Sequence, residues 1–427
     1  MLEFLDAAYQ FFPADPSRFV IGATRQANRF AILRGRNHRV RKIDLSGKVD
    51  RVKKLRDSDA RLLFVANHPS HSDPQFMTEI QRRLGITSSF MAAYDVFLRS
   101  ERQAWFMQKL GCFSIDREGS DRKAMAAAID TLKQGEMDLT IFPEGNVYLM
   151  NDRVTPFLDG TSFIATKAHQ SLKGEAEVWV IPISFKFTQL DNIREAVWQR
   201  LGKLANDSGY RGLRDPSDPE ETVLKVGEHI LSRFLREKTD IEGDFDFVGL
   251  SADGLQERLF GISNRLIGKL ENELDLDQND EVFIVDRVRK VRSRLRQIRL
   301  DEALVNQYGS DKISCMSDRA ILCFRLLAYV LPYFKEKQTL DRYAETVDRL
   351  CEDFYSRPFP PLGRRKAMAK IGMPVSMKKM LDEAGGKTRT VVPELTQLLE
   401  KRIQEGVDDL NRRNKATGIS FITTLES

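Results

Sequence analysis

Short apolar runs bounded by polar residues predict four buried β-strands in the first half of the chain. They cover residues 62–66, 112–115, 139–142 and 178–185. Apolar residues at helical spacing follow these runs, at about residues 74–84, 100–110, 121–134 and 160–168. Strands that alternate with helices of this length are typical of an α/β layered domain.

The pattern changes after a polar stretch at residues 206–221 and is helical almost throughout beyond it. The expected helices cover residues 221–237, 251–274, 281–308, 318–333, 339–355 and 393–415, with a proline-rich break at 357–363. We therefore predict an α/β fold with a mixed β-sheet flanked by helices, followed by a mostly α-helical C-terminal region. The predicted division is a basic N-terminal segment (1–56), an α/β domain (57–205) and a helical region (206–427).

The composition is that of an ordinary soluble protein, since 30% of the 427 residues are charged and 41% are hydrophobic. The first twenty residues lack the basic segment and apolar core of a signal peptide. The longest apolar run, residues 320–334, contains Arg325 and Pro332 and is too short to cross a bilayer. We therefore expect a cytoplasmic protein, peripheral on the membrane, without a signal peptide or transmembrane helix.

Positive charge is concentrated in two stretches. Residues 25–56 hold twelve Lys and Arg but two acids, and residues 287–299 hold seven basic residues and no acid. Such stretches suit anionic lipid, nucleic acid or an acidic carrier protein. The second stretch also carries Val288, Val291, Leu295 and Ile298 at helical spacing. It is therefore either an amphipathic helix on anionic lipid or a packed helix with a solvated basic face.

Candidate chemistry follows the first predicted strand, in the turn that runs from Asn67 to Pro74. A polar turn after a buried strand places its side chains at the carboxyl edge of a sheet, where α/β proteins bind ligands. If this turn leads into a helix, Asp73 can hold one ring nitrogen of His68 while the other nitrogen takes a proton. This arrangement orients a general base in acyl-transfer enzymes.

Three further segments end strands in the same way. They are Gly111 to Arg117, Phe142 to Gly145, and Val180 to Ile183 with Pro182. The four segments, in this order and spacing, resemble the signatures of the lysophospholipid and glycerol-phosphate acyltransferase family. The matching residues are His68 and Asp73, Gly111 with Ile115 and Arg117, Phe142 to Gly145, and Ile181 with Pro182. The resemblance covers about residues 55–205 and implies a glycerol-phosphate acyltransferase-like fold.

The resemblance implies a role for each matched segment. His68 would be the base and Asp73 its partner, Arg117 would hold the phosphate of the acceptor, and Phe142, Pro143, Glu144 and Gly145 would form the acceptor site. The acyl donor would be a thioester of coenzyme A or acyl carrier protein, with no metal or organic cofactor. The predicted product is a phosphatidate-type lipid of phospholipid biosynthesis, as made by 1-acylglycerol-3-phosphate acyltransferases.

Two departures from the family pattern concern the acceptor. Many members have an arginine shortly after the Phe-Pro-Glu-Gly segment, where this chain has Val147 and Tyr148, and a later lysine where it has Leu158. Arg153 or Lys167 could replace these cations in space. The departures leave open acyl transfer to a lipid hydroxyl or amine without a phosphate. A non-catalytic lipid- or nucleic-acid-binding protein is the third reading, and the intact His68, Asp73 and Glu144 argue against it.

Other reactive residues have simpler interpretations. His71 is interpreted as a turn residue or a loose contact to substrate, because a zinc site needs more ligands at close spacing. The four cysteines are scattered without a CxxC pair, which argues against a disulfide framework and fits a reducing compartment. Cys112 lies in an apolar strand and is expected to be a buried, inert thiol.

Overall fold

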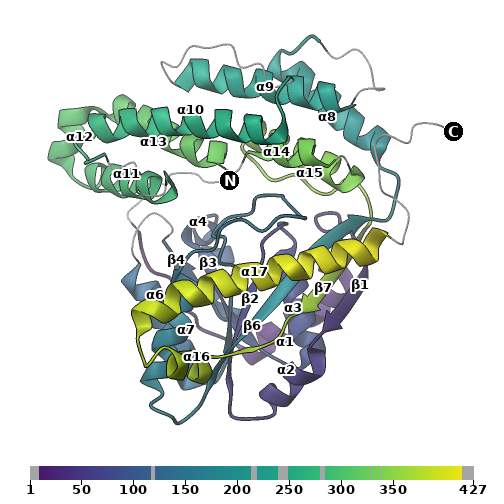
Figure 1. Cartoon of the computed structure of the whole chain (residues 1–427), viewed down its shortest axis with the longest axis vertical. Helices are drawn as coiled ribbons and strands as arrows, with labels where there is room; N and C mark the ends of the chain where they lie inside the picture. The colour runs from purple at the N-terminus through teal and green to yellow at the C-terminus, as the bar shows by residue number, and fades with distance from the viewer. Residues whose placement is uncertain are drawn as a thin grey trace.

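A β-sheet with helices on both faces forms one half of the molecule, and a layer of helices covers one end of it (Figure 1). The structure is a computed structural model. It describes residues 9–116, 121–212, 219–238, 249–278, 284–327, 329–337 and 339–415. No helix within these residues is both long enough and apolar enough to cross a membrane.

The sheet contains eight strands in the described part of the chain, in the order β1-β7-β6-β2-β5-β3-β4, with β8 paired to β6. Their bounds are β1 (Val40–Gly47), β2 (Arg61–Ala66), β3 (Ser88–Ala93), β4 (Cys112–Ile115), β5 (Asp138–Ile141), β6 (Val178–Gln189), β7 (Arg365–Ile371) and β8 (Val375–Ser376). The sheet is mostly parallel, and β6 runs antiparallel to both β7 and β8.

Alternating side chains of the central strands form two separate cores. Leu63 and Val65 of β2 pack under one set of helices, whereas Leu62 and Phe64 pack under the other. The first set is α6 (Arg122–Gln134), α7 (Gly160–Ser171), α16 (Met377–Glu383) and α17 (Thr388–Lys415). The second is α2 (Val49–Arg56) and α3 (Asp73–Leu84), with the π-helix η1 (Asn28–Ile32) and α1 (Arg18–Ala27) against α3. Near the β3–β4 edge lie α4 (Tyr94–Phe97) and α5 (Glu101–Lys109).

The helical layer has its own core of leucine, isoleucine and valine side chains. It consists of α8 (Arg194–Ser208), α9 (Pro219–Lys238), α10 (Ala252–Glu273), α11 (Ile284–Arg299), α12 (Glu302–Tyr308), α13 (Ser310–Leu327), α14 (Val330–Glu336) and α15 (Leu340–Tyr355). Val288, Val291, Leu295 and Ile298 of α11 are all buried there. The packing of this helix is therefore confirmed, whereas its basic side is not fully solvated, because Arg287 and Arg292 are buried.

Buried charges join the helical layer to the sheet. Lys186 of β6 pairs with Asp152, and the other carboxylate oxygen of Asp152 accepts a hydrogen bond from Arg342 Nε of α15 at 3.1 Å. These three side chains are almost completely buried. Separating buried ions of this kind is unfavourable, because each charge would then be buried without a partner. The helical layer is thus held in a defined position over the sheet.

The predicted fold class is confirmed, and all four predicted strands are present as β2, β4, β5 and β6. Four other strands were not predicted: β1, β3, β7 and β8. The single helix expected at residues 281–308 is wrong, because α11 ends at Arg299 and Asp301 caps a new helix, α12. The helix expected at residues 318–333 likewise corresponds to two helices, α13 and α14.

The chain returns to the sheet after the helical layer. Strand β7 lies between β1, to which it is parallel, and β6, to which it is antiparallel. Helix α17 then crosses one face of the sheet (Figure 1). The sheet therefore takes strands from all three segments into which the sequence was divided. The division at residues 56 and 205 stays a prediction.

Candidate active site

His68 and Asp73 form a hydrogen-bonded pair at the carboxyl end of β2. His68 Nδ1 lies 2.7 Å from Asp73 Oδ2, and the backbone N–H of Ser70 donates to the same oxygen at 2.8 Å. Asp73 is completely buried, whereas His68 keeps a small exposed surface. A carboxylate at Nδ1 favours the imidazole tautomer with its lone pair on Nε2. The geometry of this pair is therefore that of an oriented base.

Local structure explains how the pair forms. Strand β2 ends at Ala66, and Asp73 is the first residue of α3, followed by a proline that suits the first helical turn. Burial raises the pKa of Asp73 well above its usual range, and the Ser70 hydrogen bond and the charge of Arg365 oppose this rise. Because the carboxyl group is shielded from water, its hydrogen bond to His68 is not in competition with solvent.

Arg365 of β7 binds the loop between β2 and α3, which carries His68. Its guanidinium donates to Ser70 Oγ at 3.2 Å, to Ser72 Oγ at 2.6 Å and to the carbonyl oxygen of His38 at 2.7 Å. Five donors in a planar fork allow one arginine to hold several acceptors at once. The sequence offered no signal for this residue, since it lies far along the chain in a strand that was not predicted.

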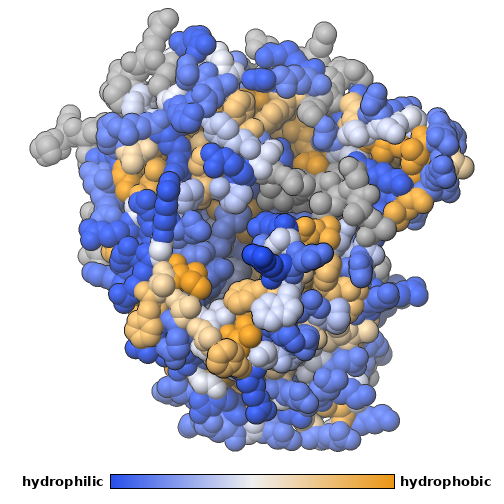
Figure 2. All heavy atoms as spheres, turned by 180° about the vertical axis from the view of Figure 1, so that it is seen from behind, coloured by the Kyte–Doolittle hydropathy of each residue, from blue (hydrophilic) through white to orange (hydrophobic). Residues whose placement is uncertain are grey.

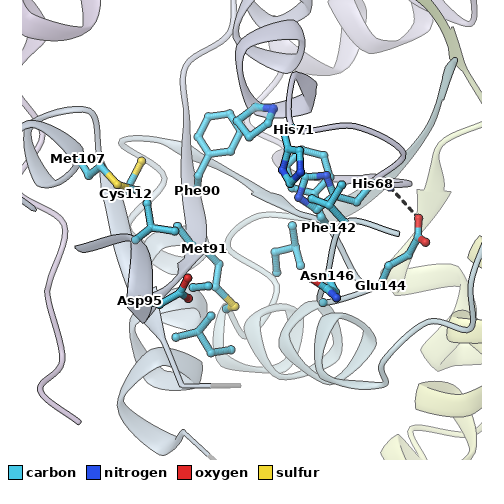
Figure 3. A pocket seen from close by; sticks show the side chains of 18 of the residues that line it. His68, His71, Phe90, Met91, Asp95, Met107, Cys112, Phe142, Glu144 and Asn146 are labelled. Carbon is cyan, nitrogen blue, oxygen red and sulfur yellow. Dashed lines mark hydrogen bonds between the residues drawn. The ribbon is translucent and has the colours of Figure 1, made fainter. Parts of the chain in front are cut away.

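Glu144 binds the other side of the loop. Its Oε1 accepts the backbone N–H of His68 at 2.6 Å, shown as the dashed line in Figure 3, and its Oε2 accepts hydrogen bonds from the N–H and hydroxyl of Thr155. Burial raises the pKa of Glu144 to about 7, although the hydrogen bonds from Thr155 and His68 lower it in part. Glu144 thus fixes the backbone of His68 and does not contact its ring in these bonds.

The rest of the Phe-Pro-Glu-Gly segment shapes the turn after β5. The ring of Phe142 stacks on the ring of His68, with centroids 4.3 Å apart and planes 18° apart. Pro143 O accepts the N–H of Leu158 at 3.0 Å. Gly145 has a φ of +70°, and a Cβ there would lie 3.0 Å from Leu158. A glycine suits this turn because other residues are strained at positive φ.

His71 contacts the helical layer. Its Nε2 lies 2.9 Å from Glu352 Oε1 of α15, and Glu352 is almost completely buried. Burial would raise the pKa of Glu352, but the hydrogen bond and charge of His71 lower it below its usual value. The sequence did not predict Glu352 as a neighbour of the site, because 281 residues separate it from His71.

Comparisons with known proteins agree with this geometry. Residues 44–186 match the model of the Acyltransferase family. This matched part of the chain carries β2 to β5, most of β6 and the His68–Asp73 pair, and we call the sheet with its covering helices the acyltransferase domain. A stretch of 93 residues is 29% identical to a 1-acyl-sn-glycerol-3-phosphate acyltransferase of Streptococcus pneumoniae and covers 22% of this chain. The matched stretch spans about a third (34%) of the length of that curated relative.

Three cations were considered for the acceptor site, and the structure describes two of them, Arg153 and Lys167. Arg117 lies outside the described residues, directly after Asp116, which pairs with Arg296 of α11. Neither Arg153 nor Lys167 lines the cavity beside His68. Arg153 instead pairs with Glu336 of α14. The two side chains considered as replacements for the missing family cations therefore lie elsewhere.

A cavity of about 1710 Å³ opens beside His68. Figure 3 shows His68, Phe142 and Glu144 on one side of it and Met107 and Cys112 on the other, with Phe90 and Met91 between them. The helical layer contributes basic residues to the same cavity, namely Arg289, Lys290 and Arg292 of α11, and Arg357 after α15. The acyltransferase domain therefore shares its cavity with the helical layer.

The remaining reactive groups are possible metal ligands and the thiol of Cys112. Among the residues that the structure describes, no group of three or more His, Cys, Asp or Glu could hold a metal ion. Cys112 is buried in β4, and burial raises the pKa of its thiol to about 12. A thiol of such a high pKa is a poor nucleophile at neutral pH. The prediction that Cys112 is buried is therefore confirmed.

Proposed function

We propose that this protein transfers a fatty acyl group from a thioester donor to the hydroxyl of a lysophosphatidate- or glycerol-phosphate-type acceptor. The observation that carries this proposal is the His68–Asp73 pair, held at the edge of a large cavity in an acyltransferase-family domain. The donor is acyl-CoA or acyl carrier protein, and no metal or organic cofactor takes part.

The proposed reaction is a direct transfer without a protein nucleophile. Nε2 of His68 accepts the proton of the acceptor hydroxyl as its oxygen attacks the thioester carbonyl carbon. The tetrahedral intermediate then expels the thiolate, which takes the proton from the imidazolium. Asp73 stabilises the imidazolium between these steps. A positioned base of this kind contributes about 10²–10⁴ in rate.

The cavity has an apolar wall near the base, His68. The wall formed by Phe90, Met91 and Met107 is apolar and suits an acyl chain, since burying its methylene groups away from water is favourable. Phe142 packs on the ring of His68 and restricts its orientation. Glu144 and the turn at Gly145 hold the loop that carries His68, which keeps the base in place as substrates bind.

The cations of the helical layer support an acceptor or donor with phosphate. Arg289, Lys290 and Arg357 line the cavity and compensate for the arginine and lysine that many family members carry near positions 147 and 158. Arginine and lysine side chains are the usual phosphate ligands. Arg117 is proposed to join them, as its place in the family pattern implies. Acyl transfer to a lipid without a phosphate is the alternative, and the departures from the family pattern favour it.

The test is an acyl-transfer assay with product identification by mass spectrometry. Purified protein is incubated with acyl-CoA or acyl carrier protein and with lysophosphatidate, glycerol 3-phosphate, or lyso-lipids that lack a phosphate. We expect phosphatidate-type products, and His68→Ala to reduce their rate by at least about 10². His169→Ala, which changes a histidine of α7, is the matched control and should retain activity.

The results of this assay distinguish the proposed function from the two alternatives. Products from acceptors without phosphate alone would favour the alternative substrate class. An absence of transfer to every acceptor, with wild type and His68→Ala behaving alike, would contradict the proposal. Tight, strongly salt-dependent binding to nucleic acid would then revive the non-catalytic reading.

A further inference from the structure

Helix α1 has an apolar surface that the rest of the protein does not cover. None of its ten residues is buried, although Phe19, Val20 and Ile21 are apolar. Phe19 is 84% exposed, and Phe30 of the adjoining η1 is 64% exposed. An isolated helix of this length is marginal in water, and helices in proteins depend on packing of their apolar face. The exposed side chains of α1 and η1 are therefore open to contact with a partner.

A second exposed apolar segment lies next to α1. The N–H of Ser17, which caps α1, donates to the carbonyl oxygen of Lys109 at the end of α5, and Phe12 stacks on Phe97 in the same region. Helix α5 exposes Trp105 (55%) and Phe106, and Leu98 before it is also exposed. We call the exposed apolar residues of the two segments the docking surface: Phe19, Phe30, Ile32, Leu98, Trp105 and Phe106.

The docking surface surrounds the opening of the active-site cavity. Ile21, Arg25 and Ile32 line the cavity from the side of α1 and η1, and Leu98, Arg102 and Phe106 line it from the side of α5. Ile32, Leu98, Arg102 and Phe106 are at the same time exposed. A side chain that both lines a cavity and faces solvent marks its opening. Figure 2 shows apolar side chains gathered among hydrophilic ones on the face opposite to that of Figure 1.

Arginines are the most frequent charged residues among these side chains, and Glu101 at the start of α5 is an exposed acid beside them. Arg18, Arg29, Arg99 and Arg102 are exposed beside them, and Arg29 lies over the ring of Phe30 at 5.0 Å. The sequence holds no acid between Asp15 and Asp44. Exposed aromatic residues combined with arginine are the composition of interfacial membrane-binding segments. A second copy of this surface would instead bring arginines against arginines, so the charge favours an anionic partner.

We propose that this surface docks on an anionic lipid bilayer and places the opening of the cavity against it. The aromatic side chains enter the boundary between headgroups and acyl chains, and the arginines lie at the level of the lipid phosphates. A lipid substrate then reaches His68 without passing through water. The inference rests on the proposed function only for this last step, since docking itself requires no catalysis.

The test is co-flotation of the full-length chain with vesicles of phosphatidylcholine, with and without phosphatidylglycerol, in the absence of substrates. We expect binding to the anionic vesicles. The combined variant Phe19→Ser, Phe30→Ser, Trp105→Ser changes three docking-surface residues that do not line the cavity, and should lower vesicle partitioning by about tenfold or more. The matched control is Phe260→Ser with Leu300→Ser, which removes two exposed apolar residues of the helical layer.

Fluorescence gives an independent readout of the same contact. The chain has three tryptophans, Trp105, Trp179 and Trp198. In a variant with Trp179→Phe and Trp198→Phe, emission from Trp105 should shift to shorter wavelength on anionic vesicles and be quenched by brominated acyl chains.

Several results would overturn the proposal. These are equal flotation of the wild type and the triple variant, an equal loss in the control variant, equal binding to vesicles without phosphatidylglycerol, or no binding by the folded wild type. A wild-type dimer that the triple variant converts to a monomer would show that a second copy covers the surface. Because no substrate is present, each of these outcomes is distinguishable from failure of the acyl-transfer assay.

Discussion

Glu144 and Asp73 hold the two ends of the short loop that carries His68. Asp73 binds the imidazole ring, and Glu144 binds the backbone N–H of the same residue. Both carboxyl groups are buried, and burial raises the pKa of each. The position of the base therefore depends on two acids that are themselves unfavourable to ionise. This arrangement has a consequence for stability as pH changes.

Glu144 should make the protein less stable as pH rises from about 4.5 to about 7. Its pKa is raised from 4.5 to about 7 in the folded protein, so the folded state binds the proton more tightly than the unfolded state. The stabilising effect is complete below pH 4.5 and is lost as pH rises to about 7, by about 3 kcal/mol. Glu144→Gln cannot ionise, so the fall in unfolding free energy between pH 5 and pH 8 should be smaller than in the wild type.

Urea unfolding of both proteins at the two pH values measures this difference. The variant also loses an acceptor for Thr155 or His68, which lowers its stability at every pH, so only the change with pH is diagnostic. The same change with pH in both proteins would contradict the raised pKa.

At the scale of secondary structure, α11 combines two roles on different sides. Val288, Val291, Leu295 and Ile298 are buried in the helical layer, while Arg289, Lys290 and Arg292 line the cavity of the acyltransferase domain. Because the apolar side of α11 is packed in the helical layer, the basic residues on its other side face the cavity. Arg296 of the same helix pairs with Asp116 after β4, which ties α11 to the end of the strand that precedes Arg117.

Arg289→Ala combined with Lys290→Ala should weaken the binding of a phosphate-bearing substrate. Hydrogen bonds to charged groups contribute about 1.5–3 kcal/mol each, so the loss of two such contacts should raise KM by about 100-fold or more, with little change in kcat. Steady-state kinetics with lysophosphatidate tests this expectation. Arg294→Ala, on the same helix but outside the cavity lining, is the matched control. Equal KM values in the wild type and the double variant would exclude α11 from phosphate binding.

At the scale of the whole molecule, the last part of the described chain completes the domain that the first half begins. Strand β7 fills the position between β1 and β6, and its Arg365 holds the loop of His68. Helix α17 covers one face of the sheet with a row of buried residues at a spacing of four: Val391, Leu395, Leu399, Ile403 and Val407. Folding of the site therefore requires contacts between distant parts of the chain.

A chain truncated after residue 363 should fail to form the folded acyltransferase domain. The truncation removes β7 and α17, which leaves β1 detached from the sheet and exposes a large apolar face to water. Circular dichroism during heating should show no cooperative unfolding transition. A chain that ends at residue 415 keeps every described element and serves as the control. A cooperative transition in the shorter chain, with acyl transfer retained, would contradict this view.

The sequence by itself determined the parts of the site that are local in the chain. His68 and Asp73 lie five residues apart, and Phe142 to Gly145 are consecutive, so a strand end and one turn suffice to arrange each group. Strands β2, β4, β5 and β6 were predictable because they are largely buried and their segments are mostly apolar. The matched segments also indicated the family, whose model matches residues 44–186.

Only the tertiary structure decided the partners that come from far along the chain. Arg365 lies 295 positions after its partner Ser70, and Glu352 lies 281 positions after its partner His71. No local sequence pattern marks contacts over such separations. Strand β7 escaped prediction because its sequence mixes Arg and Lys with Ala, Met and Ile, and shows neither a continuous apolar run nor a regular alternation. The cations of α11 reach the cavity because the buried face of that helix fixes its orientation, which is a property of packing between layers and not of the helix alone.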